Sequence, residues 1–194
     1  GTFNYINQLG IKLKQVEDLT LYPSILNGRV KTLHPKVFGG ILKTNSKSDL
    51  DESKKYEIPD IDLIVVDLYP FEDTVKNSNN HEDIIEKIDI GGVSLIRAAA
   101  KNYENVVCIS SKDQYDELVS ILNNGCKTDI EYRKKLAYEA FLKSSDYDCK
   151  IYSYLGSENI NINFERDTIK ELRYGENPHP VSYTHLRAHE TLPY

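Results

Sequence analysis

The sequence has 194 residues and a formal net charge of −6, and apolar side chains make up 40% of it. This length predicts one domain with a short appendage, and the apolar fraction is sufficient for a sizeable core. The acidic charge argues against general nucleic-acid binding, which needs a basic surface. No apolar run approaches the roughly 20 residues that span a bilayer.

Cellular location is indicated by features that the chain lacks. It has no basic-then-apolar leader at its start, and it contains no methionine, so we expect it to begin downstream of the natural start codon. Its three cysteines, Cys108, Cys126 and Cys149, are widely spaced and form no metal motif. We therefore interpret them as reduced thiols of a cytoplasmic protein.

The first half of the chain mixes short helices with one clear strand. Apolar spacing predicts a helix over residues 3–9, with Thr2 as its N-cap and Gly10 as its C-terminal cap. Further along the chain we expect a short strand over 11–16, a turn around Pro23, a helix over 36–42, a mobile polar segment over 44–55 and a strand over 61–69. The nearly continuous apolar run of the last segment is typical of a strand buried on both faces of a parallel sheet.

The second half alternates helices and strands more regularly. We expect helices over 79–88 and 93–100, a buried strand over 106–109, an amphipathic helix over 111–123 capped by Ser111, and a long helix over 129–155. The aromatic and alanine residues of the long helix suit packing against a partner helix or a second subunit. Together the elements predict an α/β fold, a layered and mainly parallel sheet with flanking helices.

The segment Asn27 to Pro35 is the first candidate binding element. It places Arg29 and Lys31 two residues apart, which in an extended segment directs both to one side, and it contains no acid of its own. Gly28 permits a tight backbone turn, and Thr32 adds a hydroxyl. These groups suit a phosphate, although a solvated basic turn accounts for the two charges equally well.

Three single residues are further candidates, each with a structural alternative. Tyr69 follows the predicted buried strand, where open α/β sheets bind ligands, but an isolated tyrosine also fits a core or interface. Asp89 precedes two glycines and would also serve as a helix cap. Lys101 ends a nearly apolar helix, where a cation is favoured on electrostatic grounds alone.

The order of these motifs carries a resemblance to a known family. The segments are Gly28-Arg-Val-Lys-Thr-Leu-His-Pro-Lys36, Asp67-Leu-Tyr-Pro-Phe71, Ile88-Asp-Ile-Gly-Gly92, Arg97-Ala-Ala-Ala-Lys-Asn102 and Leu172-Arg-Tyr-Gly-Glu-Asn-Pro-His179. They resemble the inosine monophosphate (IMP) cyclohydrolase domain, and the start of the aminoimidazole-carboxamide ribotide (AICAR) transformylase domain, of the bifunctional purine-biosynthesis enzymes. The resemblance implies a methylglyoxal-synthase-like fold.

The resemblance also implies roles for individual residues. Lys31, Tyr69, Asp89 and Lys101 would be catalytic, with Asp89 as the candidate base and the other three as candidate donors. Substrate binding would involve Thr2, Arg29, Thr32, Asp67, Gly91 and Gly92. Thr2 would close a phosphate loop, and Asp67 stands where the family more often has asparagine.

The implied reaction closes the purine ring of a formylated ribotide and releases water, with no metal or organic cofactor. The implied partners are this purine ribotide and, in the full-length protein, a second copy of the chain.

The resemblance divides the chain into three parts. Residues 1–157 correspond to the cyclohydrolase domain without its first strand, and residues 158–179 to a linker and the start of the transformylase domain. In that domain, which uses formyl tetrahydrofolate, Arg173 and Tyr174 match a ribotide-binding motif. Residues 180–194 resemble the translation of a sequencing-library adapter, so we expect them to be an artefact; a natural tail with His185 and His189 as metal ligands is the alternative.

Two other functions remain open from the sequence. A methylglyoxal-synthase-like lyase acting on a triose phosphate would share the implied fold and a phosphate site. A regulatory nucleotide-binding domain of the same fold would bind without turnover.

Overall fold

Two short parallel strands form the sheet in the part of the chain that the computed structural model describes, residues 2–156. β1 (Leu63–Val65) pairs with β2 (Val107–Ile109) in the register Leu63 to Val107 and Val65 to Ile109. Backbone hydrogen bonds extend the ladder by about one residue at each end, from Val107 N to Asp62 O and from Val66 N to Ile109 O. The predicted parallel pairing and α/β class are confirmed, and the ordered ladder is shorter than the predicted strand 61–69.

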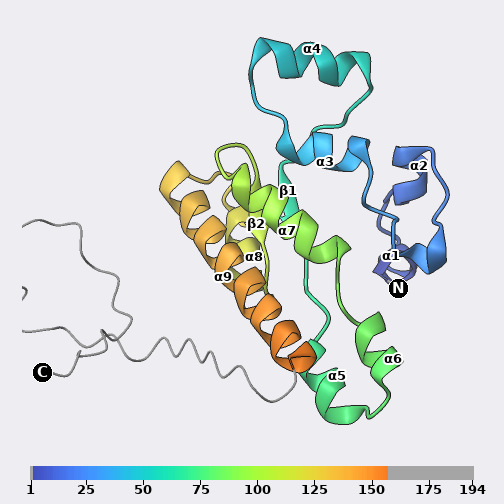
Figure 1. The fold of residues 1–194 in the computed structure, drawn as a ribbon. Helices are drawn as coiled ribbons and strands as arrows, with labels where there is room; N and C mark the ends of the chain where they lie inside the picture. The colour runs from blue at the N-terminus through green and yellow to red at the C-terminus, as the bar shows by residue number, and fades with distance from the viewer. Residues whose placement is uncertain (1, 157–194) are drawn as a thin grey trace, which may run out of the picture. The chain divides into compact units, whose positions relative to one another are not determined.

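Helices surround this pair and make up most of the described residues (Figure 1). The helices before β1 are α1 (Thr2–Gln8), α2 (Val16–Thr20), η1 (Leu26–Gly28), α3 (Pro35–Leu42) and α4 (Lys47–Lys55). Those after it are α5 (Phe71–Asn77), α6 (His81–Glu86), α7 (Gly91–Lys101), η2 (Lys112–Gln114), α8 (Tyr115–Asn123) and α9 (Ile130–Leu155). Among the described residues, none of the helices combines the length and apolarity needed to cross a bilayer.

The hydrophobic core lies between α7, α9, α3 and the strands. Figure 1 shows α9 running alongside α7 and β2, with which it makes most of its contacts. Small residues such as Ala99 and Ala140 are fully buried there, so the two helices approach closely. A second, smaller cluster joins α5, α6 and α9 through Phe71, Ile84 and Tyr147.

Two predictions for the first half were wrong. Residues 11–15 form no strand, because Asp18 accepts a hydrogen bond from Gln15 N at 3.2 Å and starts α2 instead. The segment 44–55 is helical: Ser46 Oγ accepts from Asp49 N at 3.1 Å, and lysines lie in the last turn of α4, where they suit the helix dipole.

The helices predicted near 3–9, 36–42, 93–100, 111–123 and 129–155 are confirmed within a few residues, and the one expected over 79–88 is the shorter α6. Contacts divide the chain into units of residues 1–155 and 156–194. The expected linker, transformylase motif and adapter-derived residues all lie outside the described residues.

Candidate functional site

A cavity of about 660 Å³ lies where the segment Asn27 to Pro35, here called the cationic loop, meets the connection between α6 and α7. Its lining comprises residues 27–29, 31, 32, 69 and 85–92. Seven of the residues predicted from the sequence therefore share one cavity: Arg29, Lys31, Thr32, Tyr69, Asp89, Gly91 and Gly92.

The cationic loop is a series of turns, and the extended conformation assumed for it was wrong. η1 ends at Gly28, whose φ of +85° is the left-handed conformation predicted for this glycine. Arg29 follows with helical angles, and residues 29–32 are turns. His34 is extended and caps α3, because its Nδ1 accepts from Lys36 N at 3.1 Å.

Acids from two other helices pair with the two cations. Arg29 binds Glu86 of α6 through two nitrogens, with Nη2 at 2.7 Å and Nε at 3.1 Å from the carboxylate oxygens. Lys31 Nζ lies 3.1 Å from Glu17 Oε1 of α2. The loop itself has no acid. Both partners, Glu86 and Glu17, are distant in the sequence, so neither pairing could be predicted from the loop.

These contacts shift the acidity of the carboxylates. The pKa of Glu17 is lowered to about 2, mainly by the hydrogen bond that Ser24 donates to it, and also by Lys31. Arg29 lowers the pKa of Glu86, and Glu86 in turn raises the pKa of Arg29. Both carboxylates are therefore ionised at neutral pH, and the four side chains together carry no net charge.

Asp89 sits at the N-terminus of α7 and in the cavity wall at once. Its Oδ1 accepts from Gly92 N at 2.6 Å, so the capping interpretation and the site interpretation apply to the same side chain. A Cβ on Gly92 would lie 2.5 Å from Asp89 Oδ2, so only glycine permits this approach. The backbone N–H of Asp89 donates to the hydroxyl of Tyr147 at 2.9 Å.

Tyr69 closes another part of the cavity. It lies beyond the paired portion of β1, is 59% exposed, and has the ammonium of Lys87 5.5 Å from its ring centroid. Thr32 approaches the start of α7 closely, because a Cβ on Gly91 would lie 3.2 Å from Thr32 Oγ1. The loop and the helix N-terminus thus face the same space.

Three predicted residues are not brought to this cavity. Lys101 is the last residue of α7, ten residues from Gly91 and so about 15 Å along the helix axis. Asp67 accepts a hydrogen bond from the Tyr115 hydroxyl at the start of α8. Thr2 is exposed at the start of α1 and does not line the cavity.

Arg173 and Tyr174 lie outside the described residues. Within residues 2–156, no three His, Cys, Asp or Glu side chains are grouped so that they could hold a metal ion. Cys108 is a buried thiol whose pKa is raised to about 12 by burial, and Cys126 is an exposed thiol.

Sequence reasoning missed four residues that shape the cavity. Glu17, Glu86 and Lys87 carry ordinary surface charges in the sequence, and Tyr147 is one of 14 tyrosines. Local sequence gave no signal for the two glutamates or Tyr147. Lys87 lies two residues before Asp89, and this proximity was the available signal.

Comparison with protein families divides the chain into two consecutive matches. Residues 1–94 match the family model for the MGS-like domain, and residues 99–191 match the model described as AICARFT/IMPCHase bienzyme. The first match ends and the second begins within α7.

Curated relatives match this chain along most of its length. The bifunctional purine biosynthesis protein PurH of Bacteroides thetaiotaomicron is 53% identical over 186 residues, which cover 94% of this chain and 37% of that protein. PurH of Clostridioides difficile is 41% identical over 201 residues, covering 100% of this chain and 39% of the relative. The chain therefore spans less than two fifths of the length of these two relatives.

A solved structure also resembles this one. The crystal structure of ForH matches with a TM-score of 0.69 and 35% identity, over 80% of this chain and 83% of that chain. The motifs, the two family matches and these relatives agree, and the chain belongs to the AICARFT/IMPCHase bienzyme family.

Proposed function

We propose that this chain carries the IMP cyclohydrolase activity of a bifunctional purine-biosynthesis protein. Its substrate would be the formylated aminoimidazole-carboxamide ribotide, and its products IMP and water. The observation that carries the proposal is the single cavity that gathers Arg29, Lys31, Tyr69 and Asp89 from three separate segments.

The cationic loop would bind the anionic end of the ribotide. Arg29 offers a planar fork of donors suited to phosphate, and Lys31 and Thr32 add a charge and a hydroxyl. Both cations are paired with glutamates on partly exposed side chains, and such pairs exchange readily for a better anion. Binding would therefore replace Glu86 and Glu17 with ligand oxygens.

Ring closure is intramolecular, so holding the reacting groups in contact would supply much of the acceleration. The carboxamide nitrogen attacks the formyl carbon and forms the new C–N bond while it loses a proton. Asp89 is the candidate base for that proton, because its carboxylate faces the cavity and is held by Gly92 N.

The formyl oxygen then gains negative charge and must leave as water. Lys31 and Tyr69 are the candidate donors, since both line the same cavity as Asp89. Loss of this oxygen with two protons gives the aromatic ring. Lys101 and Asp67 receive no role in this step, because neither lines the cavity.

The larger protein would have a second activity. We propose that its AICAR transformylase part uses formyl tetrahydrofolate and that Arg173 and Tyr174 contact the ribotide there. We also propose a homodimer in the cytoplasm. The residues that would form the folate site lie outside the described chain, so no step is assigned to them.

The test uses the full-length protein expressed from its genomic coding sequence. Purified protein is given the formylated ribotide, and IMP formation is followed by ultraviolet absorbance and chromatography. IMP at a rate well above the uncatalysed reaction supports the proposal. Methylglyoxal from a triose phosphate would instead assign a lyase, and nucleotide binding without turnover would assign a regulatory domain.

A further inference from the structure

A buried tyrosine of α9 reaches the backbone of the cavity wall. Tyr147 is 5% exposed, and its hydroxyl accepts from Asp89 N at 2.9 Å and donates to the carbonyl oxygen of Lys87 at 3.2 Å. One phenol thus holds two backbone groups of the short connection between α6 and α7. That connection contributes its whole length to the cavity lining.

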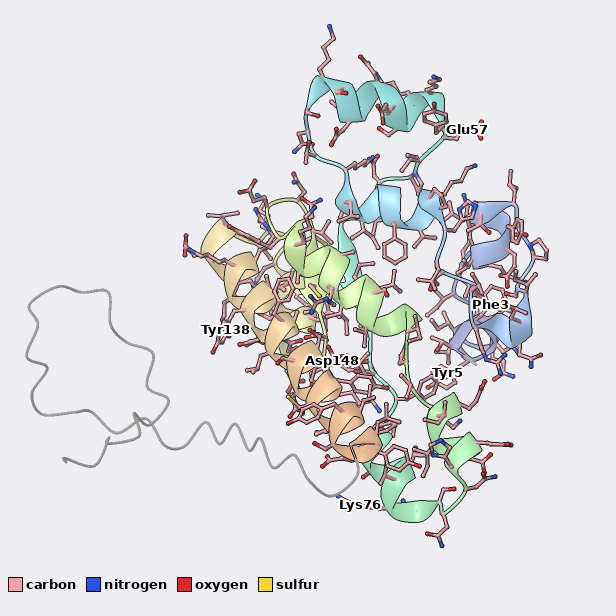
Figure 2. All side chains as sticks on the ribbon, in the orientation of Figure 1. Phe3, Tyr5, Glu57, Lys76, Tyr138 and Asp148 are labelled. Atoms are coloured by element: carbon pink, nitrogen blue, oxygen red, sulfur yellow. The ribbon has the colours of Figure 1, made fainter. Side chains whose placement is uncertain are left out.

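The ring of Tyr147 is held firmly from the other side. Phe71 packs edge-on against it, with ring centroids 6.2 Å apart and an interplanar angle of 69°. Burial raises the pKa of Tyr147, so the phenol stays protonated and both donates and accepts. The next residue, Asp148, is exposed on α9 (Figure 2), so only Tyr147 of this pair faces inward.

The connection determines where the backbone of Asp89, the candidate base, lies. Fixing the backbone N–H of Asp89 fixes the origin of its side chain, whose carboxylate is already held by Gly92 N at 2.6 Å. Holding the carbonyl of Lys87 fixes the start of the connection, directly after α6. Removing the hydroxyl would leave a donor and an acceptor without this partner in a partly buried place, and the connection would move to satisfy them.

We propose that Tyr147 is a positioning residue that holds Asp89 in the geometry for ring closure. This role rests on the cyclohydrolase function proposed above. Tyr147 does not line the cavity, so it acts through the connection and makes no contact with substrate.

The chain offers a closely matched control for this residue. Tyr154 lies two turns further along α9 and packs edge-on against the same Phe71 at 5.8 Å. Its hydroxyl contacts His81 Nδ1 at 2.8 Å on α6, outside the cavity lining. Tyr147→Phe and Tyr154→Phe therefore each remove one oxygen from the same aromatic cluster, and only the first alters the connection.

The experiment compares both variants in the full-length protein. We expect Tyr147→Phe to lower kcat about tenfold, because both hydrogen bonds that hold the connection are lost. KM should change less than twofold, because the cationic loop is untouched. Tyr154→Phe should leave kcat and KM within twofold, although both variants lower Tm by a few degrees.

Amide hydrogen exchange supplies a readout that does not depend on turnover. Asp89 N–H should exchange faster in Tyr147→Phe and at the wild-type rate in Tyr154→Phe. If the wild-type protein does not close the ring, the proposed function fails. Equal exchange rates of Asp89 N–H in the two variants would overturn the positioning of Asp89, whether or not the protein is active. In an active enzyme, a wild-type kcat for Tyr147→Phe would overturn the inference, and so would equal kcat losses in the two variants.

Discussion

Lys31 combines an exposed charge with a fixed position, and this makes it the clearest residue to remove. Lys31→Ala should raise KM for the ribotide at least tenfold, because a cation facing the cavity is lost, and it should lower kcat if the ammonium also donates to the leaving oxygen. Steady-state kinetics on the full-length protein measure both. Lys36→Ala is the matched control, since Lys36 forms a similar pair with Glu57 away from the cavity.

Asp89 has an observed contact with Gly92 N and a proposed role as the base, and a single substitution can separate the two. Asp89→Asn keeps the size of the side chain and an oxygen that can accept from Gly92 N, so α7 should stay capped. It removes the base, so kcat should fall by about 100-fold or more with a smaller change in KM. Parallel losses of stability and activity would show that Asp89 is only a helix cap.

The N-terminus of α7 needs a glycine at position 92, because a side chain there would displace the Asp89 carboxylate. Gly92→Ala would place a Cβ 2.5 Å from Asp89 Oδ2, so the carboxylate must move, and we expect kcat to fall at least tenfold. Gly91→Ala places its Cβ 3.2 Å from Thr32 Oγ1, a contact that a small shift relieves. Kinetics of the two variants, with circular dichroism to confirm folding, should show the larger loss for Gly92→Ala.

The other end of α7 is a structural junction. Asn102 is 9% exposed, and its Nδ2 donates to the carbonyl oxygens of Ile41 and Lys43 at 2.7 and 2.9 Å, which closes the C-terminus of α3. Asn102→Ala should lower the free energy of unfolding by about 1–3 kcal/mol, since buried carbonyls lose their donor. Denaturant titration measures this. Asn124→Ala, at the exposed end of α8, should stay within about 0.5 kcal/mol of wild type.

The elements that could be predicted share a strong local pattern. The long helix α9 and the buried residues of β2 have periodic or continuous apolar sequence, and that signal does not depend on the rest of the fold. The segment 11–16 alternates polar and apolar residues as a strand does, yet Asp18 favours a helix start after it. The polar composition of 44–55 predicts a mobile segment, but Ser46 at the N-cap and the order of charges, acid first and lysines last, favour a helix.

The residues of the candidate site also differ in whether the local sequence predicts them. Arg29, Lys31 and Asp89, which line the cavity, lie in dense motifs where several chemical groups are close together in the sequence. Glu17, Glu86 and Tyr147 reach the site or its wall through tertiary contacts with other helices. Lys101 shows the opposite error: its motif lies close to Asp89 in the sequence, but the side chain does not line the cavity.

For the whole molecule, several ion pairs and hydrogen bonds act together on acid stability. The pKa values of Glu17, Glu86, Asp49 and Glu117 are all lowered in the folded chain, that of Glu17 from 4.5 to about 2. A lowered pKa gives stability that is complete above the unfolded value and is lost as pH falls through the folded value. Tm should therefore be nearly constant from pH 7 to 5 and fall progressively below about 4.5.

The variant Glu17→Gln tests the largest of these shifts. It cannot ionise, so its Tm should decline less steeply between pH 4.5 and about 2 than that of the wild type. Differential scanning calorimetry across this range compares the two. Parallel Tm curves would contradict the assignment of the shift to Glu17.

The pairing of each loop cation with a glutamate also affects how fast an anionic ligand arrives. Two positive and two negative side chains cancel around the loop that carries Arg29 and Lys31, and the chain as a whole carries a charge of −6. A dianion approaching from solution therefore meets no net attraction until it is within reach of a single guanidinium or ammonium. The association rate should therefore depend little on long-range attraction and only weakly on ionic strength. Under the proposed function, selectivity would then come from the exchange of one anion for another inside the cavity.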